Sequence, residues 1–288
     1  MEIGWIGTGI MGAPMARRLI GGGHRVRVFN RTPEKARAMV ADGASVAADA
    51  AACAAGAEVV FIMVPDTPDV EATVAKIEPA LKAGQLVVDM STVAPAGERA
   101  IAARLKPSGV DYLDAPVSGG DVGAREGTLA IMVGGEANAF ERARPLFELM
   151  GKRVTHVGAP GAGQMTKLAN QIAVALALEA AAEAIKFARA GGLDAARMVE
   201  AIGAGAAGSW QLSNLGPKII AGDYRPGFFI KLVRKDLRLV AEAAREAGLA
   251  LPGLALMTSM FNTAAALGHD LDGTQAVAAA LDRLADVK

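Results

Sequence analysis

The sequence pattern changes near the middle of the chain, and this change constrains the fold more than any other feature. Before residue 158, short runs rich in β-branched residues alternate with helical patterns, and after residue 163 helical patterns follow one another. Alternation of this kind predicts parallel strands joined by right-handed helical crossovers. The later helices cannot extend such a sheet. The sequence therefore predicts a doubly wound α/β domain followed by an all-α domain.

The expected elements can be placed from hydrophobic periodicity and turn residues. Strands are expected at 2–6, 25–30, 59–64, 86–89, 111–115, 130–133 and 153–156, and helices between them at 12–20, 33–42, 68–81 and 95–105. One long Ala-rich helix at 164–189 precedes helices at 194–202, 209–221, 230–247, 254–267 and 275–285. The expected domains are 1–162 and 163–288. Charged residues punctuate the long helix, which favours an interdomain core helix over a membrane span.

Charge and cysteine content narrow the class of partner. Lys plus Arg and Asp plus Glu both number 30, a balance that argues against nucleic acid or a membrane as partner and favours a small molecule. The single cysteine, Cys53, excludes an intramolecular disulfide and a cysteine-built zinc site, and three scattered histidines suggest no metal site. Because the amino terminus enters a strand without signal-peptide features, we expect a soluble cytoplasmic protein. The apolar helical domain predicts a homodimer or homotetramer.

A glycine pattern follows the first expected strand: Gly7-Thr8-Gly9-Ile10-Met11-Gly12. Gly7 permits a tight turn, Gly9 lets the backbone approach a pyrophosphate, and Gly12 allows close helix packing. The helix amino terminus then meets the phosphates with its amides. A second match at 203–208 follows a helical segment, and we assign it to a helix-ending loop. Context thus predicts a dinucleotide-binding, Rossmann-type domain at the first match.

The end of the second strand indicates which dinucleotide binds. An NAD-selective site places a carboxylate there to accept the ribose hydroxyls, whereas this chain has Asn30-Arg31-Thr32. The Arg31 guanidinium can clasp a 2′-phosphate, and Asn30 and Thr32 can donate to it. The alternative is that Arg31 is a solvated turn residue and Thr32 caps the next helix. The sequence favours NADP(H) over NAD(H).

Four motifs together resemble the β-hydroxyacid dehydrogenase family, the group that contains 3-hydroxyisobutyrate dehydrogenase and tartronate semialdehyde reductase. The resemblance covers essentially the whole chain. The segments that carry it are the cofactor signature at 4–16, Asp114-Ala115-Pro116-Val117-Ser118-Gly119-Gly120, the segment 161–171 with Lys167 and Asn170, and Lys235-Asp236-Leu237.

The resemblance implies roles for individual residues. Lys167 would be the acid/base group and Asn170 would orient the substrate, while Ser118, Gly119 and Gly120 would bind its carboxylate. These roles make chemical sense, because an ammonium can protonate the oxygen that becomes negative as hydride arrives. A Ser-Gly-Gly loop offers a hydroxyl and unobstructed amides to an anion.

Further positions match the cofactor contacts of the family. Lys235 would lie beside the cofactor, and Val64, Pro65 and Thr92 match other contacting positions. Asp236 is interpreted as an ion-pair residue and stays outside the catalytic set.

The expected activity is the reversible NADPH-dependent reduction of a small carboxylate-bearing semialdehyde or keto acid. Tartronate semialdehyde (2-hydroxy-3-oxopropionate) is the first expectation, ahead of 3-hydroxyisobutyrate, with glyoxylate or succinic semialdehyde as close alternatives. A non-catalytic dinucleotide-binding scaffold or sensor is the alternative of another class, and the intact Lys167 and Asn170 count against it.

Overall fold

The computed structural model describes residues 1–284, and the chain divides into two compact units. Unit 1 is Met1–Lys167 and unit 2 is Leu168–Lys288. The dividing point lies within the long helix α8 (Ala162–Ala190), so the first turn of that helix belongs to unit 1. The change of sequence pattern at 162/163 coincides with the start of the same helix.

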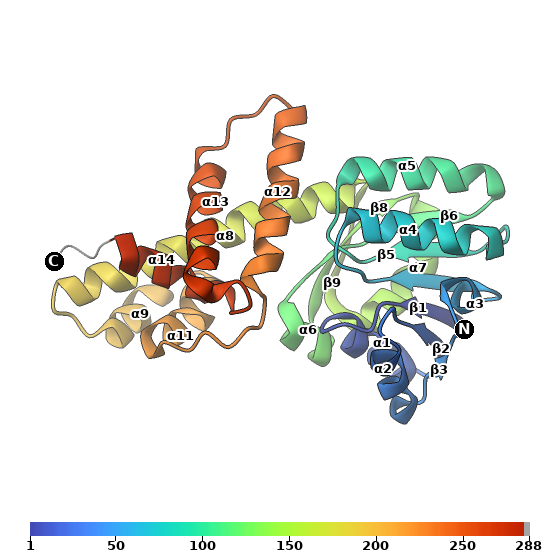
Figure 1. The fold of residues 1–288 in the computed structure, drawn as a ribbon, viewed down its shortest axis with the longest axis horizontal. Helices are drawn as coiled ribbons and strands as arrows, with labels where there is room; N and C mark the ends of the chain where they lie inside the picture. Colours follow the sequence, from blue (N-terminus) through green and yellow to red (C-terminus); the bar gives the residue numbers. More distant parts are fainter. Residues whose placement is uncertain (285–288) are drawn as a thin grey trace. The chain divides into compact units, whose positions relative to one another are not determined.

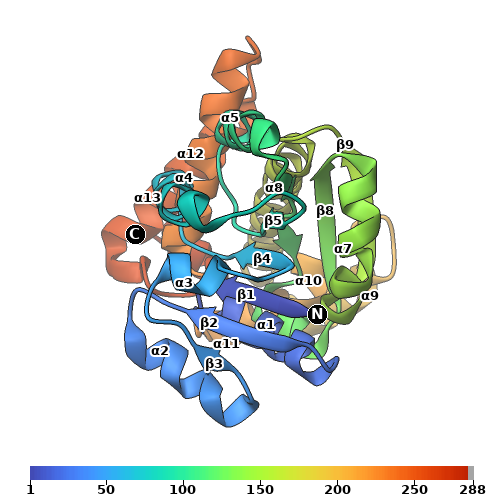
Figure 2. The ribbon, with the colours of Figure 1, turned by 90° about the vertical axis from the view of Figure 1, so that its right-hand side faces the viewer.

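Unit 1 is built on one mostly parallel sheet (Figures 1 and 2). Within the described residues the order is β3-β2-β1-β4-β5-β6-β8-β7, with β9 paired to β8. Strand β8 is antiparallel to β6 and β7, and the strands from β3 to β6 are parallel. The strands are β1 (Glu2–Ile6), β2 (Arg25–Phe29), β3 (Ser45–Val46), β4 (Val59–Ile62), β5 (Leu86–Asp89), β6 (Asp111–Asp114), β7 (Val117–Ser118), β8 (Leu129–Gly135) and β9 (Gly151–Gly158). The prediction of a Rossmann-type domain is confirmed, with two strands near one edge, β8 and β9, that run antiparallel to the others.

The crossover helices begin near the predicted positions. They are α1 (Gly12–Gly21), α2 (Pro33–Arg37), α4 (Thr67–Ile77) and α5 (Pro95–Leu105). Two predicted helices are shorter than expected, because 33–42 ends as the 3₁₀ turn Ala38–Asp42 and 68–81 ends as the turn Glu78–Ala80. In the second case Pro79 provides no backbone N–H to continue the α-helical ladder.

The central strands are buried on both faces, as parallel strands between two layers of helices must be. Along β4, Val59 and Phe61 pack into one hydrophobic cluster, and Val60 and Ile62 pack into another. Helices α1 and α7 (Ala137–Met150) cover the first face, and α3 (Ala50–Ala54), α4 and α5 cover the second. The rings of Trp5 and Phe61 stack at 5.2 Å between centroids.

Sequence reasoning missed several elements of unit 1: β3, β7, α3, α6 (Gly120–Glu126) and α7. The largest omission is α7, which contains 14 residues and buries one face. Pro145 lies inside α7, and a proline usually ends a helix. The short elements give too little periodicity to distinguish them from loops.

Unit 2 confirms the predicted all-α domain. After α8, its helices are α9 (Ala195–Gly203), α10 (Trp210–Asn214), α11 (Gly216–Ala221), α12 (Ile230–Glu246), α13 (Pro252–Ala264) and α14 (Val277–Leu284). The predicted helix 209–221 is two helices, α10 and α11, with Pro217 at the start of the second. The predicted helix 254–267 continues beyond α13 as a π-helical turn, and 275–285 begins as a 3₁₀ turn. Ala285, the predicted end of the last helix, lies outside the described residues.

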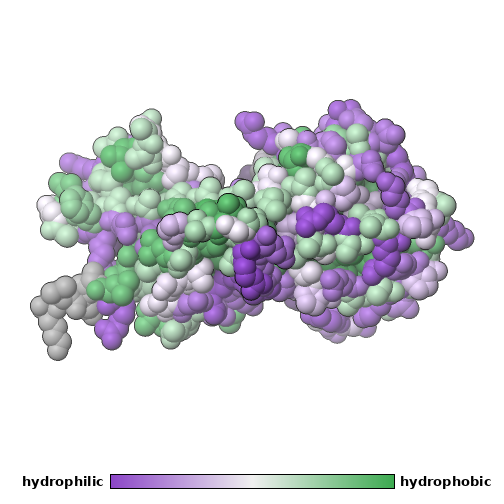
Figure 3. Space-filling model, turned by 90° about the horizontal axis from the view of Figure 1, so that it is seen from above, coloured by the Kyte–Doolittle hydropathy of each residue, from purple (hydrophilic) through white to green (hydrophobic). Residues whose placement is uncertain are grey.

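Helix α8 is long and apolar enough to cross a membrane by length and composition alone. Its buried residues recur every three or four positions, at Ala175, Leu178, Ala181, Ala182 and Ile185, as on a core-facing helix. Unit 2 also exposes large apolar side chains, with Phe187 at 81% exposure and Trp210 at 62%. Green areas over unit 2 in Figure 3 show such apolar surface. The predicted self-association rests on this surface and stays a prediction.

Candidate functional site

Apart from Lys235, which lies on α12 in unit 2, the residues predicted to bind the cofactor follow the parallel strands of unit 1. The glycine turn follows β1, Asn30 follows β2, Val64 and Pro65 follow β4, and Thr92 follows β5. Because the carboxyl ends of parallel strands meet at one edge of the sheet, these segments share that edge. In open α/β sheets, ligands bind in the crevice at this edge.

Two glycines of the turn are required by packing. Gly7 has a φ of +102°, and a Cβ built there would lie 2.0 Å from the carbonyl oxygen of Met63. A Cβ on Gly12 would lie 1.9 Å from the carbonyl oxygen of Gly7. Both contacts are far inside van der Waals distance, so larger residues cannot occupy these positions without moving the backbone.

Gly9 differs, because no contact with residues 1–284 requires a glycine there. Its φ is not positive, and a Cβ would meet no atom within 4 Å. The open space therefore fits a molecule that approaches the backbone closely. Beside it, the Thr8 hydroxyl is buried and has no hydrogen-bond partner among the described residues. An open glycine and an unsatisfied hydroxyl at a helix amino terminus are features that fit a pyrophosphate.

Ile10 and Met11 complete the turn. Ile10 is 47% exposed, and Met11 is partly buried against the core cluster under α1. Met11 stands at the N-cap of α1, and no side chain caps that helix.

The three residues after β2 are held in different ways. The Asn30 side chain accepts a hydrogen bond from the Thr8 amide at 2.9 Å and donates to the Thr32 carbonyl at 3.0 Å. Its Oδ1 therefore joins this loop to the glycine turn, and its Nδ2 is used within its own loop. Arg31 is 83% exposed and its Nη1 lies 2.9 Å from Asp69 Oδ1. Thr32 stands at the N-cap of α2, yet its hydroxyl makes no capping hydrogen bond.

A buried hydrogen-bond chain joins the loops after β4 and β5. The Val64 amide donates to Ser91 Oγ at 2.9 Å, and Ser91 Oγ donates to Asp89 Oδ1 at 2.6 Å. The Ser91 amide also donates to Asp89 Oδ1, at 3.0 Å. Ser91 and Asp89 were not among the predicted site residues, although they flank Met90 immediately before Thr92.

Asp114 fixes the start of α8. Its carboxylate accepts from the amides of Gly161 and Gln164, both at 2.8 Å. Burial raises the pKa of Asp114 to about 6, and the two amides oppose the shift. The side chain is therefore mostly ionised at pH 7 and can hold both donors.

Two further buried groups lie close to Asp89. Burial, reinforced by the Asp89 charge, raises the pKa of Glu98 well above its ordinary value. Burial and then Glu98 also raise the pKa of Tyr112. Both shifts favour the protonated, neutral forms of Glu98 and Tyr112, which lessens the charge gathered beside Asp89.

The predicted acid/base residue lies one helical turn beyond Gln164. Lys167 is 7% exposed, so most of this residue is removed from bulk water. Asn170 is three residues further and shares a helix face with Lys167. Lys167 and Asn170 therefore lie on α8 just beyond its first turn, which Asp114 holds in place.

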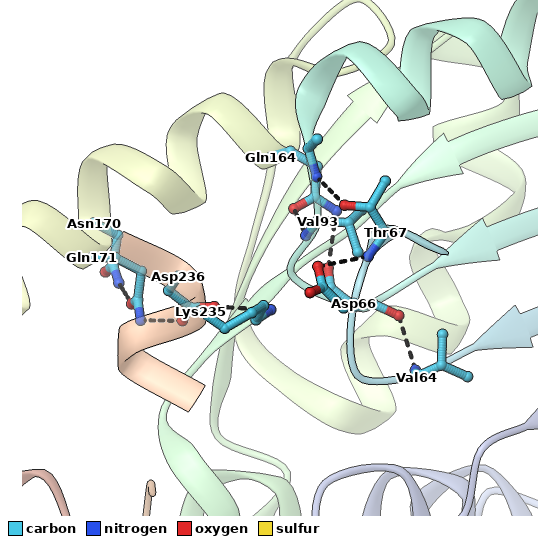
Figure 4. A network of polar contacts seen from close by, with 11 residues as sticks. Val64, Asp66, Thr67, Val93, Gln164, Asn170, Gln171, Lys235 and Asp236 are labelled. Atoms are coloured by element: carbon cyan, nitrogen blue, oxygen red, sulfur yellow. Dashed lines mark hydrogen bonds and ion pairs between the residues drawn. The ribbon is translucent and has the colours of Figure 1, made fainter. Parts of the chain in front are cut away.

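A second polar network lies within unit 2 (Figure 4). Asn170 Nδ2 donates to Gln171 Oε1 at 2.8 Å, and Gln171 Nε2 donates to Asp236 Oδ2 at 2.6 Å. Asp236 Oδ1 lies 2.9 Å from Lys235 Nζ, so the ion-pair interpretation of Asp236 is confirmed. The network fixes Asn170 and Lys235 with respect to each other. Gln171, which lies in the recognised segment 161–171 but receives no role from the sequence, connects Asn170 to Asp236.

The predicted carboxylate loop leaves the sheet at β7. Ser118 ends that strand, and Gly119 and Gly120 have φ of +134° and +64°. A Cβ at Gly120 would meet nothing within 4 Å, whereas one at Gly119 would lie 3.1 Å from the Leu129 side chain. The loop can therefore present backbone to a ligand at Gly120 without a side chain in the way.

Comparison with protein families decides the class. Residues 2–158 match the model of the NAD binding domain of 6-phosphogluconate dehydrogenase, and residues 161–280 match that of the NAD-binding domain of NADP-dependent 3-hydroxyisobutyrate dehydrogenase. The chain belongs to the 3-hydroxyisobutyrate dehydrogenase family. This confirms the resemblance carried by the four motifs. The chain is an NAD(P)-dependent oxidoreductase of this family, as predicted, rather than a scaffold of another class.

Individual relatives within the family differ in their activities. The chain is 44% identical to the 2-hydroxy-3-oxopropionate reductase of Escherichia coli strain K12, over 100% of this chain and 99% of that protein. It is 39% identical to the NAD-dependent L-serine dehydrogenase of Pseudomonas aeruginosa, over 90% and 91%. The solved structure of Mycobacterium tuberculosis 3-hydroxyisobutyrate dehydrogenase with L-serine superposes with a TM-score of 0.90 at 34% identity, covering 99% of both chains.

The glycine turn generates a paired prediction. In Gly9→Ala, the added methyl meets no protein atom, so we expect the unfolding free energy to stay within about 1 kcal/mol of the parent, while NADPH affinity falls at least tenfold. In the matched variant Gly12→Ala, overpacking against Gly7 should cost about 1–3 kcal/mol of stability. Denaturant unfolding and NADPH fluorescence titration measure the two quantities. Unchanged NADPH affinity in Gly9→Ala would remove the turn from the cofactor site.

Proposed function

We propose that the chain reduces a small carboxylate-bearing semialdehyde with NADPH, with 2-hydroxy-3-oxopropionate as the preferred substrate. The observation that carries this proposal is a buried lysine, Lys167, on the helix turn that follows the anchored start of α8. The 44% identity to the Escherichia coli reductase over the full chain supports the choice of substrate.

Oxidation of a 3-hydroxy acid such as 3-hydroxyisobutyrate is the second candidate. It is favoured by the TM-score of 0.90 to the 3-hydroxyisobutyrate dehydrogenase solved with L-serine. The two candidate reactions, reduction of a semialdehyde and oxidation of a 3-hydroxy acid, would occur at the same site on similar substrates. Glyoxylate and succinic semialdehyde are further carbonyl substrates to compare.

The residues after the parallel strands would hold the cofactor. Its nicotinamide, when bound, supplies the hydride. The turn from Gly7 to Gly12, with Thr8, Ile10 and Met11, would receive the pyrophosphate, as the open space at Gly9 supports. Further contacts are assigned to Val64, Pro65, Thr92 and Lys235.

Arg31 is assigned to the adenosine 2′-phosphate. Its guanidinium is exposed, and its bond to Asp69 leaves other N–H groups of the guanidinium to donate. The Thr32 hydroxyl, which makes no capping hydrogen bond to α2, can donate to the same phosphate. The Asn30 amide, already bonded to both loops, would shape this pocket rather than donate to the phosphate.

Lys167 would donate the proton that completes carbonyl reduction. Negative charge develops on the substrate oxygen, and the ammonium group of Lys167 would stabilise that charge and then protonate the oxygen. Asn170 would orient the same oxygen from the next turn. Ser118 and the amides of Gly119 and Gly120 would bind the substrate carboxylate and so fix which carbon receives the hydride.

The Lys167 assignment predicts a loss of chemistry with retention of binding. Lys167→Ala should lower kcat by about 10²- to 10⁴-fold, the usual size of a general-acid contribution, and leave NADPH affinity within a few-fold. Lys167→Arg keeps the charge and should recover little, because a guanidinium is too weak an acid to release its proton near neutral pH. Steady-state assays and NADPH fluorescence measure both. A near-normal kcat in Lys167→Ala would exclude Lys167 as the proton donor.

The Arg31 assignment predicts the basis of cofactor preference. The parent should prefer NADPH to NADH in kcat/KM, and Arg31→Ala should lose most of that preference because the 2′-phosphate loses its ion pair. Asp69→Asn is the matched control, since it removes the negative charge that pairs with Arg31 and keeps the guanidinium. The control should retain the preference or increase it. Equal use of both cofactors by the parent enzyme would contradict the assignment.

The carboxylate loop predicts substrate class. A semialdehyde that carries a carboxylate should be reduced with a kcat/KM at least about 100-fold above its analogue with a neutral group at that position, since a charge-assisted site loses several kcal/mol without its anion. A panel containing 2-hydroxy-3-oxopropionate, methylmalonate semialdehyde, glyoxylate and succinic semialdehyde tests the ranking in the same assay. Comparable kcat/KM values for the acid and neutral members would remove the loop from the substrate site.

A further inference from the structure

A single glutamine side chain connects the helix of Lys167 to the loop that follows β5. Gln164 is fully buried. Its Oε1 accepts a hydrogen bond from the Val93 amide at 3.1 Å, and its Nε2 donates to the Ser91 carbonyl at 2.9 Å (Figure 4). These partners are the residues immediately before and after Thr92. The side-chain amide of Gln164 therefore holds the backbone on both sides of Thr92, a residue assigned to cofactor binding.

The backbone of Gln164 is fixed at the same time. Its amide donates to Asp114 Oδ2 at 2.8 Å, and Asp114 Oδ1 holds Gly161 at the preceding turn. A Cβ at the intervening Gly163 would lie 2.5 Å from the carbonyl oxygens of both Asp114 and Met132. The start of α8 is therefore packed against the end of β6 and the middle of β8, with no space for a side chain at position 163.

The loop that Gln164 contacts is itself anchored. Ser91 Oγ donates to Asp89 and accepts from the Val64 amide, which belongs to the loop after β4. Because the hydroxyl proton goes to Asp89, the Ser91 oxygen is left to accept from Val64, and the Ser91 carbonyl is left for Gln164. The hydrogen bonds thus run without interruption from the loop after β4 to the first turn of α8.

We propose that Gln164 is a positioning residue for the reaction, because it sets the place of Lys167 relative to the cofactor loops. Lys167 is three residues beyond Gln164 on α8, so a shift of one moves the other. A misplacement of about 1 Å between reacting groups can cost about 100-fold in rate. The proposal rests on the function proposed above, since it acts through Lys167 as the proton donor.

The test compares two replacements of similar size. Gln164→Leu removes both hydrogen bonds, whereas Gln164→Glu retains them only when its carboxyl is protonated, with C=O as acceptor and O–H as donor. We expect Gln164→Leu to lower kcat by about 10- to 100-fold, with NADPH affinity within about threefold of the parent. Its primary deuterium isotope effect on kcat, measured with deuterated NADPH, should be at least as large as in the parent.

The glutamate variant supplies a readout that a purely structural role would not change. Its kcat relative to the parent should rise as the pH falls, because protonation restores the donor to the Ser91 carbonyl. The neighbouring acids Asp89, Glu98 and Asp114 and the phenol of Tyr112 are present in both enzymes, so the ratio isolates position 164. Should Gln164→Leu fail to fold by thermal unfolding, this pH series decides the proposal alone.

Three results would overturn the proposal. They are a parent-like kcat in Gln164→Leu, a kcat ratio for Gln164→Glu that does not change with pH, and a loss of NADPH affinity that parallels the loss of kcat. Lys167→Ala in the same assays distinguishes a failure of the positioning role of Gln164 from a failure of the proposed function. If Lys167→Ala is impaired and Gln164→Leu is not, the positioning role fails and the proposed function stands. A parent-like kcat in Lys167→Ala removes the proposed function itself.

Discussion

Parallel hydrogen bonding between β1, β2, β4, β5 and β6 determines where chemistry can occur in unit 1. Each of these strands runs in the same direction, so every loop that follows one emerges at the same edge. Residues far apart in sequence thereby become neighbours along that edge. Burial of both sheet faces by helices leaves the edge as the place where backbone and polar side chains can meet a ligand.

The sequence predicts this part well because its constraints are local. The positive φ of Gly7 and the contact of Gly12 with the Gly7 carbonyl lie within the turn and recur wherever a strand, a tight turn and a helix follow one another. The contact of Gly7 with the Met63 carbonyl comes instead from the neighbouring strand β4. The same glycine spacing at 203–208 begins at the last residue of α9 and ends before α10, as the prediction of a helix-ending loop requires. The elements on either side of a glycine pattern, rather than the pattern alone, carry the information.

Other features could not be predicted because they depend on long-range contacts. The Gln164 side chain bonds to residues 71 and 73 positions earlier, and no pattern near Gln164 indicates that its amide is buried. Asp114 belongs to a recognised motif, yet its hold on Gly161 and Gln164 appears only once β6 and α8 are packed. Asn30 shows the converse, since a residue expected to donate to a phosphate instead joins two loops of the protein.

The measurement that tests this account most directly is a crystal structure of the enzyme with NADP⁺ and an unreactive carboxylate-bearing substrate analogue. The account predicts the pyrophosphate against Gly9, the analogue carboxylate on the amides of Gly119 and Gly120, and Lys167 Nζ within about 3.2 Å of the oxygen that would be protonated. Lys167 bonded to a phosphate, or to protein groups alone with the reactive oxygen elsewhere, would contradict it.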